Sequence, residues 1–568
     1  MLRQPLFIVL RALRSTAMLC LILLLSFASA YAQTSAATLS GTVVDQNNAI
    51  VPSVEIVITN PATALERTTT TSDAGYFTVP LLPPGTYVIT AKRQGFAPIR
   101  ISNLVLNVGD NKSVQIELRA GDVNAQVTID SDAETVRTDG SVGTVVNRQF
   151  VANIPLNGRS LQALIQLTPG VVLTSNRGDS ATGAAQFSIN GQRTTSNYFM
   201  VDGVSANTGI TVGVGFAPGA SGSGQTAGTT ALGGTNSLVS LDALQEFRVE
   251  TSTFAAEFGR TPGGQISLLT RGGANEFHGS ASYYFRNDAL DANDWFANAN
   301  RQPKPKERQS LFGGVFGGPI KRDRLFFFGS YEGLRLQQPK VAVVTVPSTA
   351  LRTQAPAALR PYLNALPLPN GRDFGDGTAQ LAASYSEPAK FDVFAIRIDG
   401  RVAKDLMGFF RFSHAPSETK SRFFSLSTLR AVQARNDSYT GGITWVPQPH
   451  LTFDWRVNWT RNAGRAFDDL DTFNGAVIPN SSDVFLPGRD PSKAQFSFNA
   501  PGSSGFFWGS GIADIQRQFN AVGTAGWSIN AHQFKFGVDY RRLLPLLGGA
   551  AGGFQEQLFF RTAADVAS

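Results

Sequence analysis

The sequence predicts a mainly β protein that is exported from the cytoplasm. Charged residues make up 16% of its 568 positions, against about 25% in an ordinary soluble protein, while Gly (56) and Phe (41) are frequent. Many segments alternate apolar and polar residues with period two, which is typical of strands. High aromatic and low charged content excludes a disordered chain. The length predicts roughly three to four domains.

The N-terminus has the parts of a secretory signal peptide. Three arginines precede an apolar stretch at 17–27, which is followed by small residues up to Ala32. This order predicts a signal peptide over 1–32, cleaved after Ala32 or Ala30. The alternative is a retained anchor, but the apolar core is short for a membrane-spanning helix of about 20 residues.

Cysteine and charge content exclude several function classes. The single cysteine, Cys20, lies in the signal peptide, so the mature chain would have no disulfides, thiolate metal ligands or cysteine nucleophiles. The net charge of +7 is spread over the whole chain. Its densest basic run, 301–308, is broken by two prolines and contains no aromatic residue. We therefore expect no nucleic-acid partner.

Residues 37–119 read as a small β-sandwich of about seven short strands separated by turn residues. The phrases at 73–77, 82–87 and 95–96 resemble the carboxypeptidase regulatory-like domain, which implies a transthyretin- or Ig-like, carbohydrate-binding-like fold. No His or Cys lies between residues 38 and 118, so no zinc peptidase site is expected there. A spacer or docking role is favoured over glycan contact.

A short β-prone stretch follows in the linker 120–132. Such a stretch can add itself to the sheet edge of a partner protein. The alternative is that it is the next strand of the same chain, and the residues do not decide between the two. The stretch contains Val123, Ala125, Gln126, Val127, Thr128 and Ile129.

Residues 133–275 differ in character from the sandwich. They contain one helical segment, 161–165, among strand-and-turn phrases. A Gly/Ala/Ser/Thr-rich stretch from Asn207 to Asn236 is predicted to be a mobile loop, because its composition cannot form a core.

This region resembles the plug of TonB-dependent outer-membrane receptors, and 263–279 resembles that family's plug-to-barrel junction. With the sandwich in front, the Oar-like branch is the nearest resemblance. It implies an α+β plug over 133–275 and a ligand-side surface on the loop bounded by Asn207 and Asn236. The residues that match plug phrases are Asn157, Gly158, Arg159, Asn190, Gly191, Asp202, Gly203, Glu257, Gly259 and Arg260.

From residue 276 onward the segments alternate aromatic or aliphatic residues with polar ones, as at 391–399 and 451–459. A transmembrane β-barrel strand has this pattern, although strands of a soluble sandwich also alternate. Short turns near 320–324 and 447–450 alternate with long loops predicted at 339–390 and 462–511. The signal peptide, the aromatic content and this alternation of turns and loops favour the membrane barrel, so we expect the first part of an antiparallel outer-membrane β-barrel over 276–568, with about nine to ten strands. A plugged transporter has about 22, so the chain is expected to be part of a longer protein.

No catalytic, cofactor or metal site is predicted. The four histidines, His278, His414, His450 and His532, show no metal-ligand spacing. The resemblance implies a non-enzymatic receptor in the outer membrane of a Gram-negative-type bacterium, with its N-terminal domain in the periplasm. Its partners would be the TonB–ExbB–ExbD complex, membrane lipid and an extracellular ligand such as an oligosaccharide, a metal chelate or a peptide. The alternatives are a structural or adhesion protein on the same scaffold and a carbohydrate-binding surface protein.

Overall fold

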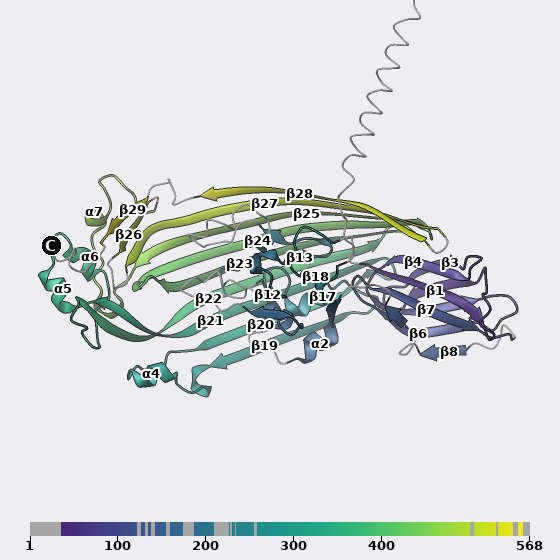
Figure 1. The fold of residues 1–568 in the computed structure, drawn as a ribbon, viewed down its shortest axis with the longest axis horizontal. Coiled ribbons are helices and arrows are strands. Elements are labelled where there is room, and N and C mark those ends of the chain that lie inside the picture. The colour runs from purple at the N-terminus through teal and green to yellow at the C-terminus, as the bar shows by residue number, and fades with distance from the viewer. Residues whose placement is uncertain are drawn as a thin grey trace, which may run out of the picture.

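The computed structural model has three parts arranged along its long axis (Figure 1). A small sandwich lies at one end, long strands form a curved sheet, and shorter elements of 142–270 lie against the inner face of that sheet. The structure describes residues 36–121, 127–130, 135–137, 142–154, 160–173, 187–208, 226–227, 230–232, 235–254, 258–492, 494–499, 505–529, 532–548 and 555–560. The predicted signal peptide and the predicted site residues Val123, Ala125, Gln126, Asn157, Gly158, Arg159 and Glu257 lie outside them. Among the described residues, no helix has the length and apolar content needed to cross a membrane.

The sandwich consists of two sheets with strand orders β4-β1-β7-β9 and β3-β2-β5-β6-β8. Alternation along each strand buries one face, as at Tyr87, Ile89 and Ala91 of β5. Gly41 is needed because a Cβ there would lie 2.7 Å from the Phe77 ring. These elements confirm the predicted sandwich. They are β1 (Ala37–Asp45), β2 (Glu55–Asn60), β3 (Leu65–Thr70), β4 (Tyr76–Leu82), β5 (Gly85–Lys92), β6 (Ile99–Leu106), β7 (Asn111–Leu118), β8 (Val127–Asp130) and β9 (Thr135–Arg137).

Strand β8 is the described part of the β-prone linker stretch. It pairs in parallel with β6, from Ile99 opposite Val127 to Ser102 opposite Asp130. For these four residues the structure shows a strand of the same chain. Because β8 ends its sheet among the described strands, its outer edge is unpaired there, and use of that edge by a partner stays a prediction.

The region after the linker folds around a sheet of its own, with strand order β10-β17-β18-β13-β14. The predicted helical segment is confirmed as α3 (Leu161–Ile165), whose Ser160 Oγ accepts a hydrogen bond from Ala163 N at 3.2 Å. Its core continues into the curved sheet through Val315 and Phe328. The other elements are β10 (Val142–Asn147), α2 (Arg148–Asn153), β11 (Val171–Leu173), β12 (Phe187–Ile189), β13 (Tyr198–Val201), β14 (Val204–Ser205), β15 (Asn207–Thr208), β16 (Thr226–Ala227), β17 (Leu244–Ser252) and β18 (Gln265–Thr270).

The curved sheet is built from long antiparallel strands in sequence order, with two short strands joined near one end. In the described residues nine long strands are present, in agreement with the expected number. They are β19 (His278–Asn287), β20 (Arg308–Lys321), β21 (Leu325–Pro347), β22 (Thr378–Arg401), β23 (Leu406–Phe423), β24 (Ser425–Gln448), β25 (Leu451–Leu470), β27 (Phe506–Ile529) and β28 (His532–Gly548). The short strands are β26 (Gln495–Asn499) and β29 (Gln555–Phe559).

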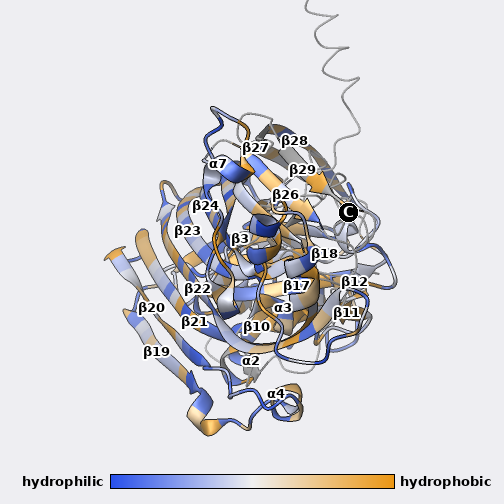
Figure 2. Cartoon of the chain, turned by 90° about the vertical axis from the view of Figure 1, so that its left-hand side faces the viewer, coloured by the Kyte–Doolittle hydropathy of each residue, from blue (hydrophilic) through white to orange (hydrophobic). Residues whose placement is uncertain are grey.

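The long strands bury their polar side chains and expose their aromatic ones, the reverse of a soluble sheet. Along β25, Asp454 and Asn458 are buried against the plug side, whereas Trp455 and Trp459 are 44% and 38% exposed on the outer face. Figure 2 shows hydrophobic and hydrophilic residues alternating along these strands. Polar residues inside and aromatic residues outside are what a strand facing lipid requires, and the predicted alternation is confirmed.

The two ends of the sheet differ in their connections. Short turns lie at the sandwich end, and long connections carrying α5 (Thr349–Gln354), α6 (Arg360–Asn364) and α7 (Ser481–Val484) lie at the other (Figure 1). The predicted long loops at 339–390 and 462–511 were too wide, because the strands on either side run further. Residues 341–346 of β21 and 379–383 of β22 are mostly apolar at successive positions, so the alternation with period two is lost before these strands end.

Truncating the side chain that covers Gly41 should destabilise the sandwich. Phe77 is 1% exposed, and removing such a ring leaves a cavity worth about 3–5 kcal/mol. We expect Phe77→Ala to lower the urea midpoint of the sandwich, measured by pulse proteolysis of the intact protein. Val105→Ala, at a side chain that is 47% exposed, is the control. Equal midpoints for the two variants would contradict this packing.

Candidate functional site

The turn between β13 and β14 holds a buried carboxylate. Asp202 and Gly203 have φ values of 52° and 79°, which suits a two-residue hairpin turn. Asp202 is 1% exposed. Its carboxylate accepts hydrogen bonds from Thr270 N at 3.0 Å and Thr270 Oγ1 at 2.9 Å. The turn is thereby fixed to β18, the last strand before the barrel.

Three arginines of the barrel wall converge on this turn. Arg397 Nη1 of β22 lies 3.0 Å from Asp202 Oδ1, and Arg411 Nη1 of β23 lies 3.9 Å from Oδ2. Arg456 Nη1 of β25 donates to the Asp202 carbonyl at 2.6 Å. A Cβ at Gly203 would overlap the Arg456 guanidinium, so glycine permits the close approach.

Two of these arginines are held in place by neighbours on their own strands. Arg397 Nε donates to Asp399 at 3.0 Å, and Arg456 Nε donates to Asp454 at 2.8 Å. The spacing of two residues puts each pair on one face of its strand. The charges inside the barrel are therefore compensated within a small network.

Burial and the arginines act oppositely on Asp202. Burial alone would raise the pKa of this carboxyl, but Arg397, Arg411 and the hydrogen bonds from Thr270 outweigh it and lower the pKa below its ordinary value. Asp202 is therefore ionised at neutral pH. A buried ion pair of this kind is costly to break from one side, because the remaining charge is left unpaired.

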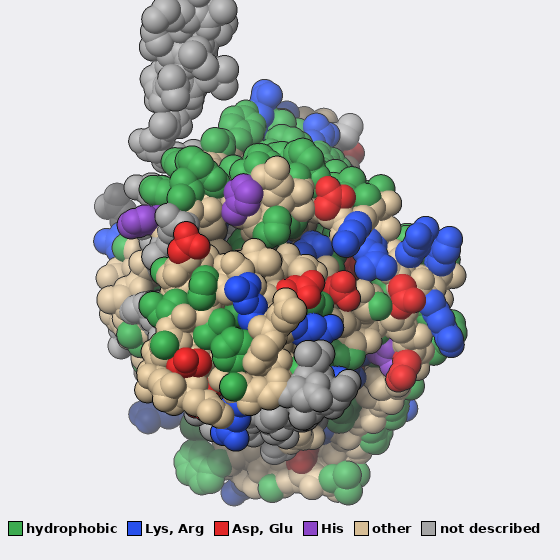
Figure 3. Space-filling view, turned by 90° about the vertical axis from the view of Figure 1, so that its right-hand side faces the viewer, with side chains coloured by type: hydrophobic (Ala, Val, Ile, Leu, Met, Phe, Trp, Pro, Cys, Tyr) green, Lys and Arg blue, Asp and Glu red, His purple; other side chains and the backbone are tan. Residues whose placement is uncertain are grey.

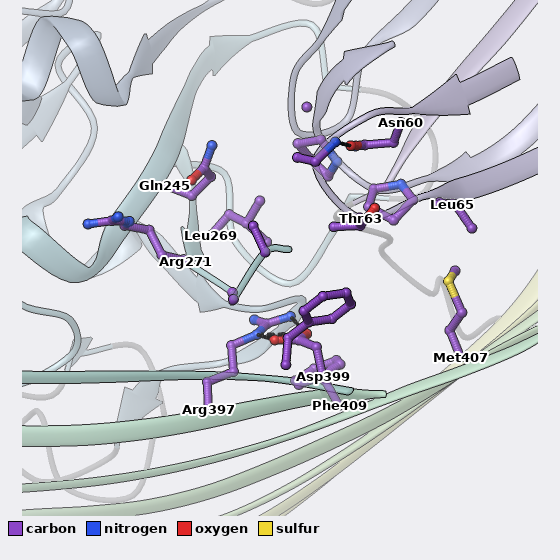
Figure 4. Close-up of a pocket in the computed structure, with 18 of the residues that line it drawn as sticks. Asn60, Thr63, Leu65, Gln245, Leu269, Arg271, Arg397, Asp399, Met407 and Phe409 are labelled. Carbon is purple, nitrogen blue, oxygen red and sulfur yellow. Dashed lines mark hydrogen bonds and ion pairs between the residues drawn. The ribbon is translucent and has the colours of Figure 1, made fainter. Parts of the chain in front are cut away.

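A cavity of about 800 Å³ lies beside this network, where the sandwich, the plug and the barrel wall meet. Figure 4 shows Arg397 and Asp399 beside Phe409 on the barrel side, Gln245 and Arg271 on the plug, and Asn60, Thr63 and Leu65 on the sandwich. The Arg397 guanidinium carbon lies 4.4 Å from the centre of the Phe409 ring. Movement of any of the three parts would alter this cavity.

The sandwich contacts the plug through buried charges. Its turn at 107–110 faces β17, where Arg248 Nη1 lies 3.6 Å from Asp110 and donates to the Val108 carbonyl at 3.2 Å. Val108 N donates to Glu246 Oε1. Burial, helped by the neighbouring Asp110, raises the pKa of Glu246 to about 8, although the hydrogen bond from Val108 and the charges of Arg248 and Lys112 oppose the shift.

The sandwich also contacts the short turns of the barrel. Arg67 Nη1 donates to the Lys404 carbonyl at 3.3 Å, and Arg401 Nη1 donates to the Ala64 carbonyl at 3.1 Å. In the view from this end (Figure 3), acidic and basic side chains are interspersed among uncharged ones.

The structure places the remaining predicted site residues in separate positions. Asn190 and Gly191 form a turn, and Asn190 Nδ2 donates a hydrogen bond to Thr251 O at 2.9 Å. Arg260, next to Gly259, pairs with Asp539 of β28 at 3.0 Å, a second contact of the plug with the barrel. Among the predicted site residues that the structure describes, only Asp202 and Gly203 lie in the arginine network.

The two residues that bound the predicted ligand-side loop have structural contacts. Asn207 is buried, and its side chain accepts from Phe199 N at 2.8 Å, while Asn236 Oδ1 accepts from Leu161 N at 3.4 Å. Most residues between them lie outside the described part. A ligand-side role for this loop stays a prediction.

Sequence reasoning missed Arg397, Arg411 and Arg456. The available signal was their position on the polar face of alternating strands, with an aspartate two residues away for Arg397 and Arg456. In the described part of the chain, no group of three or more His, Cys, Asp or Glu side chains is placed to hold a metal ion.

Comparison with known families agrees with this arrangement. Residues 269–355 and 352–555, together just over half of the chain, match the family model of the outer membrane beta barrel domain. The chain belongs to this family. Residues 38–119 match the carboxypeptidase regulatory-like domain. The protein is therefore an outer-membrane β-barrel protein with an N-terminal regulatory-like domain.

The chain matches only part of the length of each individual relative. The TonB-dependent transporter Oar of Myxococcus xanthus is 28% identical over 341 residues, which are 56% of this chain and 29% of Oar. The outer membrane transporter YddB of Escherichia coli has a TM-score of 0.48 at 11% identity, covering 70% of this chain and 48% of YddB. The ferric enterobactin receptor PfeA of Pseudomonas aeruginosa has a TM-score of 0.44 at 13% identity, and the match covers 72% of this chain and 49% of PfeA. The chain thus spans less than half of each relative.

Removing the charge of Asp202 should loosen the plug. We expect Asp202→Asn to destabilise its contact with the barrel by about 3–5 kcal/mol, because Arg397 and Arg411 lose their shared partner. The measurement is the rate of protease cleavage within the plug in isolated membranes. Because the pKa of Asp202 is lowered on folding, its contribution is present above the ordinary value of 3.8 and is lost as the pH falls through the lowered one. The exposed Asp73→Asn is the control, and equal cleavage rates in the two variants would contradict the network's role.

Docking of the sandwich on the plug should weaken with rising pH. The pKa of Glu246 is about 8 in the docked state against an ordinary 4.5, so its contribution is complete below pH 4.5 and is lost as the pH rises through 8. Spin labels at Asp73→Cys and Arg193→Cys, both exposed, should give a narrow distance distribution at pH 5.5 and a broader one at pH 8.5. Glu246→Gln should remain narrow at both. An unchanged distribution in the protein with Glu246 intact would exclude this switch.

Proposed function

We propose that this protein is a TonB-dependent receptor that imports a ligand through a plugged barrel with energy from the inner membrane. The observation that carries the proposal is the Asp202 network, in which polar contacts join the plug to the walls β22, β23 and β25. When a pulling force separates the plug from the wall, entering water can form hydrogen bonds in place of these ion pairs and hydrogen bonds. Water cannot replace apolar contacts in the same way. The relationship to Oar, a TonB-dependent transporter, supports the same function.

The fold offers a path for a pulling force. The linker precedes β10, which lies at the edge of the plug sheet and pairs antiparallel with β17 from Val142 to Asn147. A pull on the linker reaches the short strand β9, which pairs with β7 of the sandwich, and then this edge strand. Its departure would expose β17, which carries Glu246 and Arg248 of the sandwich contact. The plug would then lose support stepwise, beginning on the sandwich side.

The connections of the sheet support an orientation. Outer-membrane barrels have short periplasmic turns and longer extracellular loops, so the sandwich end would face the periplasm. The described piece of the 207–236 loop contacts β23, where Ala231 N donates to Ser417 Oγ at 2.8 Å. Ser417 lies roughly 37 Å along the strand from its start at Leu406, which places this contact toward the extracellular end. A ligand such as an oligosaccharide, a metal chelate or a peptide would approach there.

Contact of the linker with TonB can be tested in a background without other thiols. Thr128→Cys should form a disulfide-linked product with the TonB C-terminal domain carrying a cysteine in its pairing strand, because β8 offers a free edge. Asp73→Cys, exposed on the sandwich, is the control and should give no product. Equal yields from both positions would contradict strand pairing.

Deletion of 123–129 separates transport from a passive role. We expect normal insertion into the outer membrane and loss of the TonB-dependent phenotype, because the force no longer reaches β10. Normal insertion with an unchanged phenotype would instead favour a structural or adhesion protein on the same scaffold.

A further inference from the structure

The outer face of the curved sheet carries a polar hollow that the transport proposal does not use. Inward positions at this level contact the plug: Ala231 packs with Val432, Ala434 and Ala466, and bonds to Ser417. Side chains alternate between the two faces of a strand. The intervening Glu418, Gln433, Arg435 and Arg465 therefore point away from the plug, toward the surroundings of the barrel.

A row of aromatic rings crosses the same outer face on the sandwich side of this level. Ring centres of Phe394 and Phe412 are 6.5 Å apart, those of Phe412 and Tyr439 are 4.9 Å apart, and those of Tyr439 and Trp459 are 5.6 Å apart. Phe394, Tyr439 and Trp459 are 43%, 41% and 38% exposed. Aromatic girdles of this kind lie at the boundary between hydrocarbon and headgroups.

Directly beyond this aromatic row, the outward positions become charged. Arg335 Nη2 lies 2.9 Å from Asp392, Lys390 Nζ lies 2.8 Å from Glu418, and Arg465 Nε donates to Gln433 at 2.7 Å. Together with Arg435, these residues line a hollow of about 680 Å³. The hollow therefore lies at the depth where lipid headgroups begin.

The charge of the hollow is unbalanced. Its outward side chains include four basic residues, Arg335, Lys390, Arg435 and Arg465, and two acidic ones, Asp392 and Glu418. A third outward carboxylate, Asp437, pairs with Arg435 at 2.7 Å, which leaves four basic against three acidic side chains on this face. Asp514 of β27 also borders the hollow and is 7% exposed. The side chains of Arg335, Lys390 and Arg435 remain 46%, 56% and 51% exposed in spite of their ion pairs. Donors are therefore left for an anion, and Pro416, Ala463 and Ile515 add an apolar border.

We propose that this hollow binds the phosphorylated headgroup of an outer-leaflet lipid. Guanidinium groups present paired donors that match phosphate oxygens, and basic residues next to the hydrocarbon attract anionic lipid. Continuity with the aromatic row favours a membrane lipid over a soluble anion, because the acyl chains would lie against those rings. The site depends on the placement of the barrel in the membrane and not on transport.

The test uses the full-length protein in detergent, with bisphosphorylated lipid A in mixed micelles as the probe and native mass spectrometry as the readout. The double variant Arg435→Gln/Arg465→Gln should bind lipid A about thirtyfold more weakly, which corresponds to about 2 kcal/mol for two basic residues. The control Arg322→Gln/Arg324→Gln removes two exposed charges from a turn at the opposite end of the sheet and should bind like the unmodified protein.

Two further measurements decide the assignment. Arg435→Lys/Arg465→Lys keeps both charges and should retain most of the binding, which would exclude misfolding as the cause of the loss. Equal binding by the glutamine variant and the control would overturn the site. Binding of inorganic phosphate at millimolar concentration without any binding of lipid A would show a free-anion site and would overturn the lipid assignment.

Discussion

A carboxylate buried among arginines is the constraint on which the arrangement of plug and wall depends. Asp202 occupies a two-residue turn of the plug sheet, and its backbone and side chain together contact β18, β22, β23 and β25. The turn cannot tilt or slide without separating at least one of these charges from its partner. The plug is therefore held in one defined position, and the ion pairs and hydrogen bonds that hold it there are interactions that water can replace.

The fold was largely predictable because its two periodic signals are strong. Alternation in 391–399 and 451–459 and the turn phrases of the sandwich reflect which face of each strand meets lipid, water or core. Helix 161–165 was readable from its flanking Ser160 and the Thr168-Pro169-Gly170 stop. Strand ends were less readable: β21 runs to Pro347 and β22 begins at Thr378, and apolar residues at successive positions near these ends hide the period of two.

The candidate site was only half predictable. The Asp202–Gly203 phrase indicated a tight turn, but its barrel-wall partners are 195 and 254 residues away in sequence, and only the curvature of the sheet around the plug brings them together. The same holds for Glu246, an ordinary residue of an alternating strand until the sandwich turn 107–110 covers it. Local spacing contains no information on such contacts, since they are decided by how whole domains dock.

The open edge of β8 has a mechanical consequence. A partner strand added there would extend the sandwich sheet without displacing β6, so a pull on it would load the whole sandwich as well as the linker. The sandwich rests on the plug through Asp110 and Arg248 and on the barrel turns through Arg67 and Arg401. The pulling force would then be shared between two routes. One route runs along the covalent chain of the linker, and the other runs through the sandwich to its contacts with the barrel turns.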